Sequence, residues 1–318
     1  SSSPNHLTAV GNTLYFAAND GTNKIELWKS DGTSSGTVMV KNINSAYDSN
    51  PSVLTPIGNT LYFRAHDGSN GNELWKSDGT SSGTVMVKDI NSGVSGSSPD
   101  YLTAVGSTLY FRATDGTNGI ELWKSDGTAS GTVMVKDITG SAHASSPAQL
   151  TAVGNTLYFS ANDGTTNGTE LWKSDGTASG TVMVRDINSG SSSSGPIYFT
   201  AVGNTLYFRA LDGIHGTELW KSDGTTSGTV MVQDINSNGN AGPRQSVLMG
   251  NTLYFQAYQP TYGGELWALD PANITGLSGG SGSSSGGGMT NVTGATSCTA
   301  SPNLPTGLSI DSSTCTIS

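Results

Sequence analysis

Charged side chains are scarce in this chain of 318 residues, and positively charged ones are the scarcest. Asp, Glu, Lys and Arg make up 12% of the residues, with 24 Asp and Glu against 14 Lys and Arg. The formal net charge of -10 disfavours nucleic acid as a partner, because phosphates are bound by clustered Lys and Arg. It also disfavours anionic lipid surfaces.

Long apolar runs are missing as well. Apolar residues come in short runs broken by Gly, Asn, Asp and Ser, far from the roughly 20 residues that span a bilayer. We therefore expect no membrane insertion. The sequence opens "SSSPNHL", without a charged and apolar leader, so either a leader has been removed or the chain is not secreted.

The chain has only two cysteines, and they lie close together. Cys298 and Cys315 stand in a stretch rich in Ser, Thr and Gly, which is typical of a disulfide in an oxidising compartment. A zinc site would need four ligands, and the sequence offers no others nearby. Three N-glycosylation sequons, at Asn167, Asn273 and Asn291, agree with that compartment. We predict an extracellular or cell-surface location.

What the chain has in abundance is one repeated octapeptide, "ELWKSDGT". It begins at Glu26, Glu73, Glu121, Glu170 and Glu218, and a sixth copy at Glu265 departs as "ELWALDPAN". The six tryptophans recur every 47 to 49 residues, at Trp28, Trp75, Trp123, Trp172, Trp220 and Trp267. A fixed period of this size indicates a solenoid or a propeller.

Each repeat contains four strand-like runs. In the second repeat they are "SVLTPIG", "NTLYFRAHDG", "NELWKSDGT" and "GTVMVKDI", rich in the β-branched and aromatic residues that strands prefer. Gly-Asn, Asn-Gly and Asp-Gly pairs separate the runs and close hairpins. No window shows the apolar spacing of a helix. The sequence predicts an all-β domain.

Four antiparallel strands in about 48 residues match one propeller blade, so we expect a six-bladed β-propeller over residues 1–270. Apolar residues on both faces of "NTLYF" and "TVMV" suit a blade held between two neighbours. The alternative is a linear solenoid, whose terminal repeats would be polar. The first repeat is as apolar as the others, which favours a closed ring.

The motif "ELWKSDGTxxGT", followed by "VMVKDINSG", resembles the ELWxxDGT-repeat proteins, large surface or secreted proteins of bacteria and archaea. The resemblance covers residues 1–270. The later segment "LPTGLSIDSSTCTIS" is similar to the opening of an Ig-like domain of the kind found in adhesins. Together they imply an architecture and a surface location, but no activity.

The carboxylates of the repeat have a structural and a functional interpretation. A Glu found in every repeat is unsuited to catalysis, which needs a unique partner in one cleft, so we expect a structural role. Arg64, Arg112 and Arg209 are placed to pair with these Glu residues across a hairpin. The Asp-Gly pairs favour hairpin turns over calcium sites, which need six or more oxygens at one place. We expect no metal and no cofactor.

Local function is expected where the repeats differ. The positions just after the proline that opens each inner strand vary from repeat to repeat. Residues of this set that suit stacking on a sugar and hydrogen bonding to it are His6, Tyr101, Gln149, Tyr198, Arg244 and Gln245. If the inner strands line a central channel, these residues ring its mouth. Free drift of loop positions after duplication explains the same variation.

No catalytic set emerges from the sequence. The four histidines lie in different repeats, and no Ser-His-Asp or Cys-His arrangement can be assembled. We therefore expect no enzyme. Two functions remain: an extracellular structural or adhesive module, including a subunit of a surface fibre, and a carbohydrate-binding propeller, with cleavage of carbohydrate the weaker form of the second.

The composition changes after Asp270. Residues 271–289 read as a Gly/Ser-rich linker and residues 290–318 as a partial Ig-like segment. The sixth repeat lacks the "GTVMVKDI" run, so its blade has no outer strand of its own. We expect residues 273–277 or 289–294 to complete it, either in the same chain or from a second copy. Donation between copies would allow self-association through the open edge of blade six.

Overall fold

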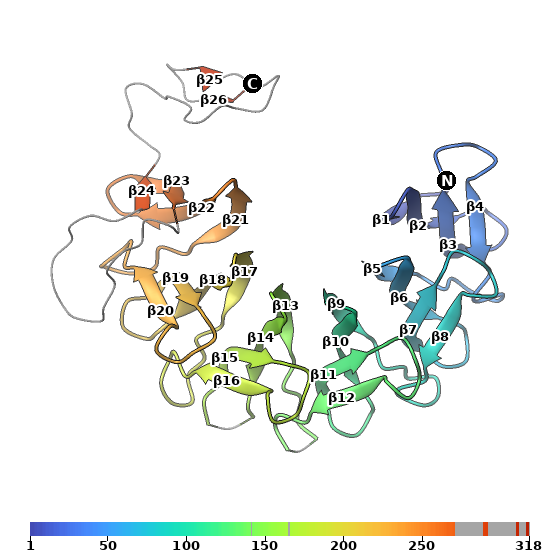
Figure 1. The fold of residues 1–318 in the computed structure, drawn as a ribbon, viewed down its shortest axis with the longest axis horizontal. Helices are drawn as coiled ribbons and strands as arrows, with labels where there is room; N and C mark the ends of the chain where they lie inside the picture. The colour runs from blue at the N-terminus through green and yellow to red at the C-terminus, as the bar shows by residue number, and fades with distance from the viewer. Residues whose placement is uncertain (141, 165, 271–288, 292–309, 312–315, 318) are drawn as a thin grey trace.

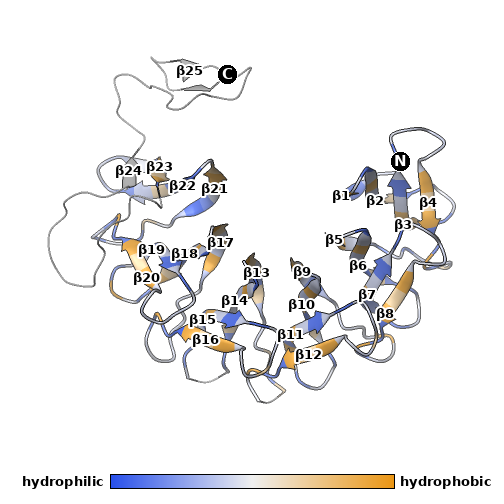
Figure 2. Ribbon diagram, in the orientation of Figure 1, coloured by the Kyte–Doolittle hydropathy of each residue, from blue (hydrophilic) through white to orange (hydrophobic). Residues whose placement is uncertain are grey.

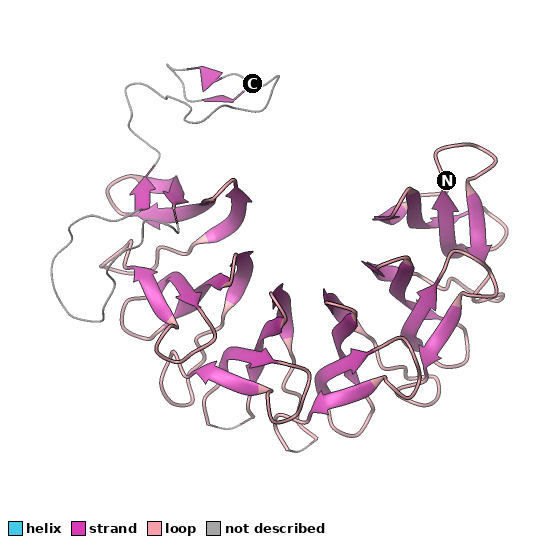
Figure 3. Cartoon of the chain, viewed as in Figure 1, coloured by secondary structure: helices cyan, strands magenta, loops and turns pink. Residues whose placement is uncertain are grey.

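A computed structural model describes the chain except for residues 141, 165, 271–288, 292–309, 312–315 and 318. The described residues form strands and turns without a helix, as Figure 3 shows. Consequently the described chain contains no helix with the length and hydrophobicity needed to cross a membrane. The all-β prediction is confirmed.

Six four-stranded antiparallel sheets, sheets 1 to 6 in chain order, account for the repeats. The innermost strands are β1 (Asn5–Val10), β5 (Ser52–Ile57), β9 (Asp100–Val105), β13 (Ala148–Val153), β17 (Ile197–Val202) and β21 (Arg244–Met249). The second strands are β2 (Thr13–Asn19), β6 (Thr60–His66), β10 (Thr108–Thr114), β14 (Thr156–Asn162), β18 (Thr205–Leu211) and β22 (Thr252–Gln259). The third strands are β3 (Ile25–Ser30), β7 (Asn72–Ser77), β11 (Ile120–Ser125), β15 (Thr169–Ser174), β19 (Thr217–Ser222) and β23 (Gly263–Leu269). The outer strands are β4 (Val38–Lys41), β8 (Val85–Lys88), β12 (Val133–Lys136), β16 (Val182–Arg185), β20 (Val230–Gln233) and β24 (Met289–Asn291).

The sheets stand side by side around an arc, with the innermost strands toward its centre (Figure 1). This arrangement is propeller-like, but the arc is open, because sheet 1 and sheet 6 lie at its two ends and do not meet. The closed ring expected from the sequence is thus corrected to an open arc. Closure depends on the angle between successive sheets, which is set by packing and leaves no mark in a repeat pattern.

Sheets 2 to 5 each have a neighbouring sheet on either side. The residues of their "LYF" runs are therefore buried on both faces. In sheet 2, β6 pairs with β7 so that Phe63 lies opposite Trp75, and both are buried. The apolar "VMV" runs of the outer strands stand out in Figure 2 along the outer edge of the arc.

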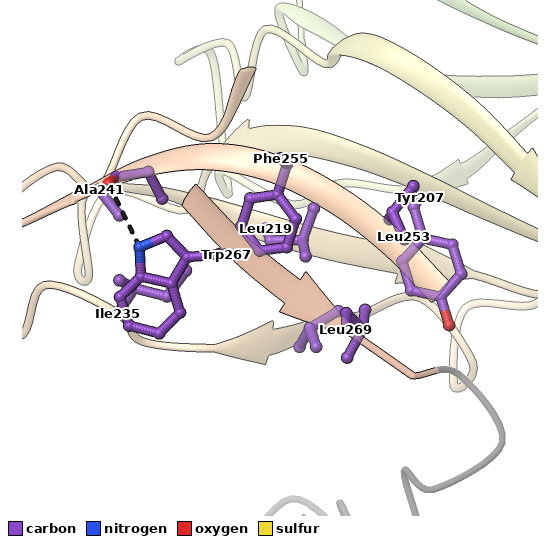
Figure 4. Packing of buried hydrophobic residues seen from close by; sticks show 10 residues of the cluster. Tyr207, Leu219, Ile235, Ala241, Leu253, Phe255, Trp267 and Leu269 are labelled. Atoms are coloured by element: carbon purple, nitrogen blue, oxygen red, sulfur yellow. Dashed lines mark hydrogen bonds between the residues drawn. The ribbon is translucent and has the colours of Figure 1, made fainter. Parts of the chain in front are cut away.

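The hydrophobic core is divided into one cluster for each junction between sheets. At the junction of sheets 1 and 2, Val10, Tyr15 and Leu27 of sheet 1 pack with Leu61, Phe63 and Trp75 of sheet 2. Figure 4 shows the junction of sheets 5 and 6, where Tyr207 and Leu219 meet Leu253, Phe255 and Trp267. The dashed line there is the hydrogen bond from Trp267 Nε1 to the carbonyl of Ala257, at 3.3 Å.

The sixth sheet obtains its outer strand from beyond the repeats. Strand β24 pairs antiparallel with β23, placing Asn291 opposite Trp267 and Met289 opposite Leu269. The predicted completion within the chain is confirmed, and the segment that begins at Met289 supplies it. Asn291, one of the sequon asparagines, is therefore part of a sheet.

Little of the remaining tail can be compared with expectation. Strands β25 (Ile310–Asp311) and β26 (Thr316–Ile317) form a two-stranded ladder, and the described residues show no Ig-like sandwich. Cys298, Cys315 and Asn273 lie outside the described residues, so the disulfide remains a prediction.

Candidate functional site

The repeated Glu residues tie each sheet to the next through the connector, the segment between an outer strand and the following inner strand. In the first connector, Ile43 N and Asn44 N donate to the Glu26 carboxylate at 2.8 and 3.3 Å, and Ser49 Oγ donates at 2.7 Å. Glu26, Glu73, Glu121, Glu170 and Glu218 all have a relative exposure of 0%. The structural role predicted for these Glu residues is confirmed.

The arginines do not pair with these Glu residues, contrary to expectation. Arg112 forms an ion pair with Asp100 at 3.0 Å. Arg64 donates to Ser52 Oγ at 3.1 Å and to the Pro99 carbonyl at 3.4 Å. The reason is the register: Arg64 lies opposite Leu74 and its neighbour Ala65 lies opposite Glu73, so the Arg and Glu side chains point to opposite faces of the sheet.

Two further residues of the repeat, a lysine and a tyrosine, also contact the following sheet. Lys29 Nζ donates to the carbonyl of Gly79 at 2.8 Å. The Tyr15 hydroxyl abuts the same glycine, where an added Cβ would lie 2.3 Å from it. Both contacts recur at Gly127, Gly176 and Gly224. The repeated motif is therefore a joint between neighbouring sheets.

The Asp-Gly pairs form turns. Asp31 Oδ1 accepts hydrogen bonds from Thr33 N at 2.9 Å and Thr33 Oγ1 at 2.7 Å, while Gly32 takes a φ of 92°. The turn interpretation is confirmed. Among the residues that the structure describes, no three His, Cys, Asp or Glu side chains are grouped to hold a metal. The sequon residue Asn167 donates from Nδ2 to Asp163 Oδ2 at 2.6 Å.

The variable positions after the prolines lie on the inner edge of the arc, in an unusual backbone conformation. Each inner strand has a β-bulge there; in sheet 3, Asp100 pairs with Arg112 but Thr103 pairs with Tyr110. The bulged residue has positive φ in all six sheets, at His6, Val53, Tyr101, Gln149, Tyr198 and Gln245. Positive φ in bulky residues is strained and concentrates at functional sites.

Two of these positions carry an Arg-Tyr pair. The Arg112 guanidinium lies 4.6 Å from the ring centre of Tyr101, and that of Arg209 lies 5.2 Å from the ring centre of Tyr198. The tyrosines remain 36% and 42% exposed. Gln149 accepts a hydrogen bond from Tyr198 N at 3.1 Å, which links sheets 4 and 5.

The other predicted site residues lie toward the ends of the arc. His6 lines a hollow of about 310 Å³ with Asn50 and Arg64. Arg244 lines a second hollow of about 260 Å³ with Arg209 and donates to Gln256 Oε1 at 2.9 Å. Gln245 is exposed. The predicted residues thus share one edge, but the structure does not bring them into one cavity.

Sequence reasoning missed Arg112 and Arg209 as members of this inner edge. The available signal was cross-strand pairing, since each Arg lies opposite the residue that precedes the variable one, Asp100 or Ile197. The bulge adds one residue to the inner strand, so counting residues outward from the hairpin turn gives the wrong partner.

Comparison with known proteins bears on the fold alone. No protein-family model matches the chain, and no curated protein does. Among solved structures, the chain is similar to prolyl oligopeptidase B from Galerina marginata, with a TM-score of 0.54, 13% identity and coverage of 85% of this chain and 42% of that one. It is also similar to a structure from a study of two prolyl endopeptidases, with a TM-score of 0.52, 14% identity and coverage of 84% and 40%.

A third similarity, with a TM-score of 0.48 and 11% identity, is to the β-propeller domain of the Trilobed protease from Pyrococcus furiosus; it covers 84% of this chain and 82% of that one. The chain spans about two fifths of the length of the two structures named before it. At this level of identity, the similarity supports a propeller-like fold for this chain and does not bear on its activity.

Proposed function

We propose that the chain is an extracellular structural or adhesive module without catalytic activity. Its six sheets act as propeller blades that form a stiff, curved scaffold, and copies of the chain associate with one another. The resemblance to surface repeat proteins and the sequons support the location.

The observation that carries this proposal is the use made of the repeated residues. The Glu carboxylates hold connectors, Lys29 and its equivalents reach the next sheet, and Tyr15 and its equivalents pack on the next Asp-Gly turn. Residues that recur in the first five repeats therefore serve rigidity, which is the property that a scaffold needs.

Self-association has a route through the outer edge of sheet 6. Strand β24 covers only residues 267–269 of β23 and follows a Gly/Ser-rich segment, so two copies could exchange it. Sedimentation velocity of the full chain over a concentration series tests the proposal. We expect species larger than a monomer that grow with concentration, and a monomer at every concentration would contradict it.

A second candidate function, carbohydrate binding, is favoured by the exposed Tyr101 and Tyr198 beside their arginines. Aromatic faces stack on sugars, and the neighbouring guanidinium can donate to hydroxyl groups. A glycan array tests it: specific binding should be lost in Tyr101→Ala and Tyr198→Ala and kept in Tyr47→Ala, which removes a tyrosine that is 73% exposed in a connector. An array without signal would exclude this function.

A further inference from the structure

The two ends of the arc expose apolar residues that are buried in every other sheet. Leu14 of sheet 1 is 36% exposed, whereas its equivalents Leu61, Leu109, Leu157, Leu206 and Leu253 are at 0%. Leu266 of sheet 6 is 48% exposed, whereas its equivalents Leu27, Leu74, Leu122, Leu171 and Leu219 are at 3% or less. We name the first surface the N face (Leu7, Leu14 and Trp28) and the second the C face (Met249, Tyr254 and Leu266).

These faces are the two unlike halves of one junction. Inside the chain, residues equivalent to the C face (Val10, Tyr15 and Leu27) pack on residues equivalent to the N face (Leu54, Leu61 and Trp75). The same pairing recurs at the four later junctions. The C face is therefore shaped for the N face, and neither is shaped for its own kind.

A second complementarity supports this pairing. Gly79, Gly127, Gly176 and Gly224 each abut the hydroxyl of a tyrosine from the preceding sheet, at 2.3 Å from an added Cβ. Gly32, their equivalent on sheet 1, has no atom within 4 Å of that point. Tyr254, the equivalent of those tyrosines on sheet 6, is half-buried at the other end of the arc.

We propose that the C face of one copy binds the N face of a second copy, in a head-to-tail contact that repeats the internal junction. Tyr254 then lies on Gly32, and Leu266 packs on Leu14. This inference rests on the proposed self-association and identifies the two surfaces that form the contact. A heterologous contact of this kind continues from copy to copy unless it closes into a ring.

The contact is weaker than an internal junction because some polar bonds are missing. Lys29, Lys76, Lys124 and Lys173 each donate to a carbonyl of the next sheet, but Ala268 stands at that position in sheet 6. The covalent connector is missing too. Association is accordingly reversible and carried by apolar burial.

Two charge variants of the full chain provide the test by sedimentation velocity. Leu14→Asp breaks the N face and Leu266→Asp breaks the C face, and each should weaken association at least about 100-fold by burying an unpaired carboxylate. Val94→Asp, at a connector residue that is 79% exposed, is the matched control and should associate as the wild type does. Unchanged melting temperatures will show that the variants fold.

Mixing is the decisive step. Each Leu variant alone is expected to be monomeric, yet an equimolar mixture still offers one intact C face and one intact N face, and should give a 1:1 dimer and nothing larger. Ala268→Lys should restore the missing hydrogen bond and tighten wild-type association about tenfold.

Three outcomes would overturn the inference. Association that survives both Leu variants but is lost in Thr290→Pro would assign self-association to exchange of β24, leaving the proposed function intact. Loss of association in Leu266→Asp alone would indicate a contact between two C faces. A wild-type chain that stays monomeric at all concentrations would overturn both the inference and the proposed self-association.

Discussion

At the scale of single residues, the buried Glu side chains decide how one repeat is held to the next. Glu121 accepts hydrogen bonds from Ile138 N at 3.2 Å and from Ser145 N at 2.8 Å, and Ser145 Oγ donates to it at 2.5 Å. The donors lie 17 and 24 residues along the chain. A carboxylate that accepts hydrogen bonds from residues this distant from it in the sequence fixes the path of the connector.

Glu121→Ala should lower the free energy of unfolding by about 3 kcal/mol, because it leaves buried N–H groups without an acceptor. Glu265→Ala is the matched control, since Glu265 occupies the same motif position but is half-exposed, and it should cost less than about 0.5 kcal/mol. Urea denaturation measures both values. Equal losses of unfolding free energy in the two variants would contradict a role of the buried Glu carboxylates in holding the connectors.

The same residues predict a pH dependence. Burial raises the pKa of Glu170 and of Glu218 to about 7, and it raises the pKa of Glu26, Glu73 and Glu121 as well. The folded state then binds more protons than the unfolded state between about pH 4.5 and 7, so stability should fall as pH rises through that range. His215, whose pKa is raised by its hydrogen bond to Asp212, contributes with the same sign.

Melting temperatures from pH 5 to pH 8 provide the check. Glu170→Gln removes one of the titrating groups and should flatten the profile. A wild-type melting temperature that increases with pH over this range would rule out carboxylates of raised pKa.

The glycine of the octapeptide offers a comparison within one chain. Gly79→Ala meets both an unfavourable φ of 87° and the Tyr15 hydroxyl, whereas Gly32→Ala, measured on the monomer, meets only a φ of 92°. We expect about 1 to 2 kcal/mol of destabilisation for Gly32→Ala and clearly more for Gly79→Ala. Tyr15→Phe should recover part of the difference. Equal effects at the two glycines would show that the tyrosine contact is unimportant.

At the scale of elements, the sequence predicted the strands and turns because the "LYF", "ELW" and "VMV" runs are rich in residues that strands prefer and are separated by Gly, Asn and Asp turn formers. It also predicted that sheet 6 would be completed by a later segment, and β24 lies in one of the two segments proposed. It could not predict that Glu121 binds the connector, because two of the donors are backbone N–H groups that any sequence provides and the third is the hydroxyl of Ser145, one serine among many. The Asp100 and Arg112 pair was hidden by the bulge between them.

The tryptophan of each third strand packs on the preceding sheet. Trp123→Ala should destabilise the chain by about 3 to 5 kcal/mol through a cavity between sheets. Trp28 has no preceding sheet in the chain and is half-buried, so Trp28→Ala should cost much less when measured on the monomer. Thermal or urea unfolding at low concentration compares them. A Trp123→Ala chain that loses ligand binding at unchanged stability would make this tryptophan a contact residue.

At the scale of the whole molecule, the open arc determines which surfaces the chain exposes. Its inner edge presents variable, strained residues, and its ends present the two halves of a junction that the chain forms five times internally. A closed ring would hide both end faces and would leave only the inner edge for recognition. The proposed assembly of copies therefore depends on the arc being open.

The most direct test of openness compares two distances in one monomeric background, Leu266→Asp. Spin-labelled amino acids at Thr13 and Thr252 report the distance between sheets 1 and 6, and labels at the equivalent Thr205 and Thr252 report the distance between adjacent sheets 5 and 6. Pulsed electron paramagnetic resonance should give a clearly longer distance for the first pair. Equal distances for the two pairs would mean a closed ring and would contradict the account.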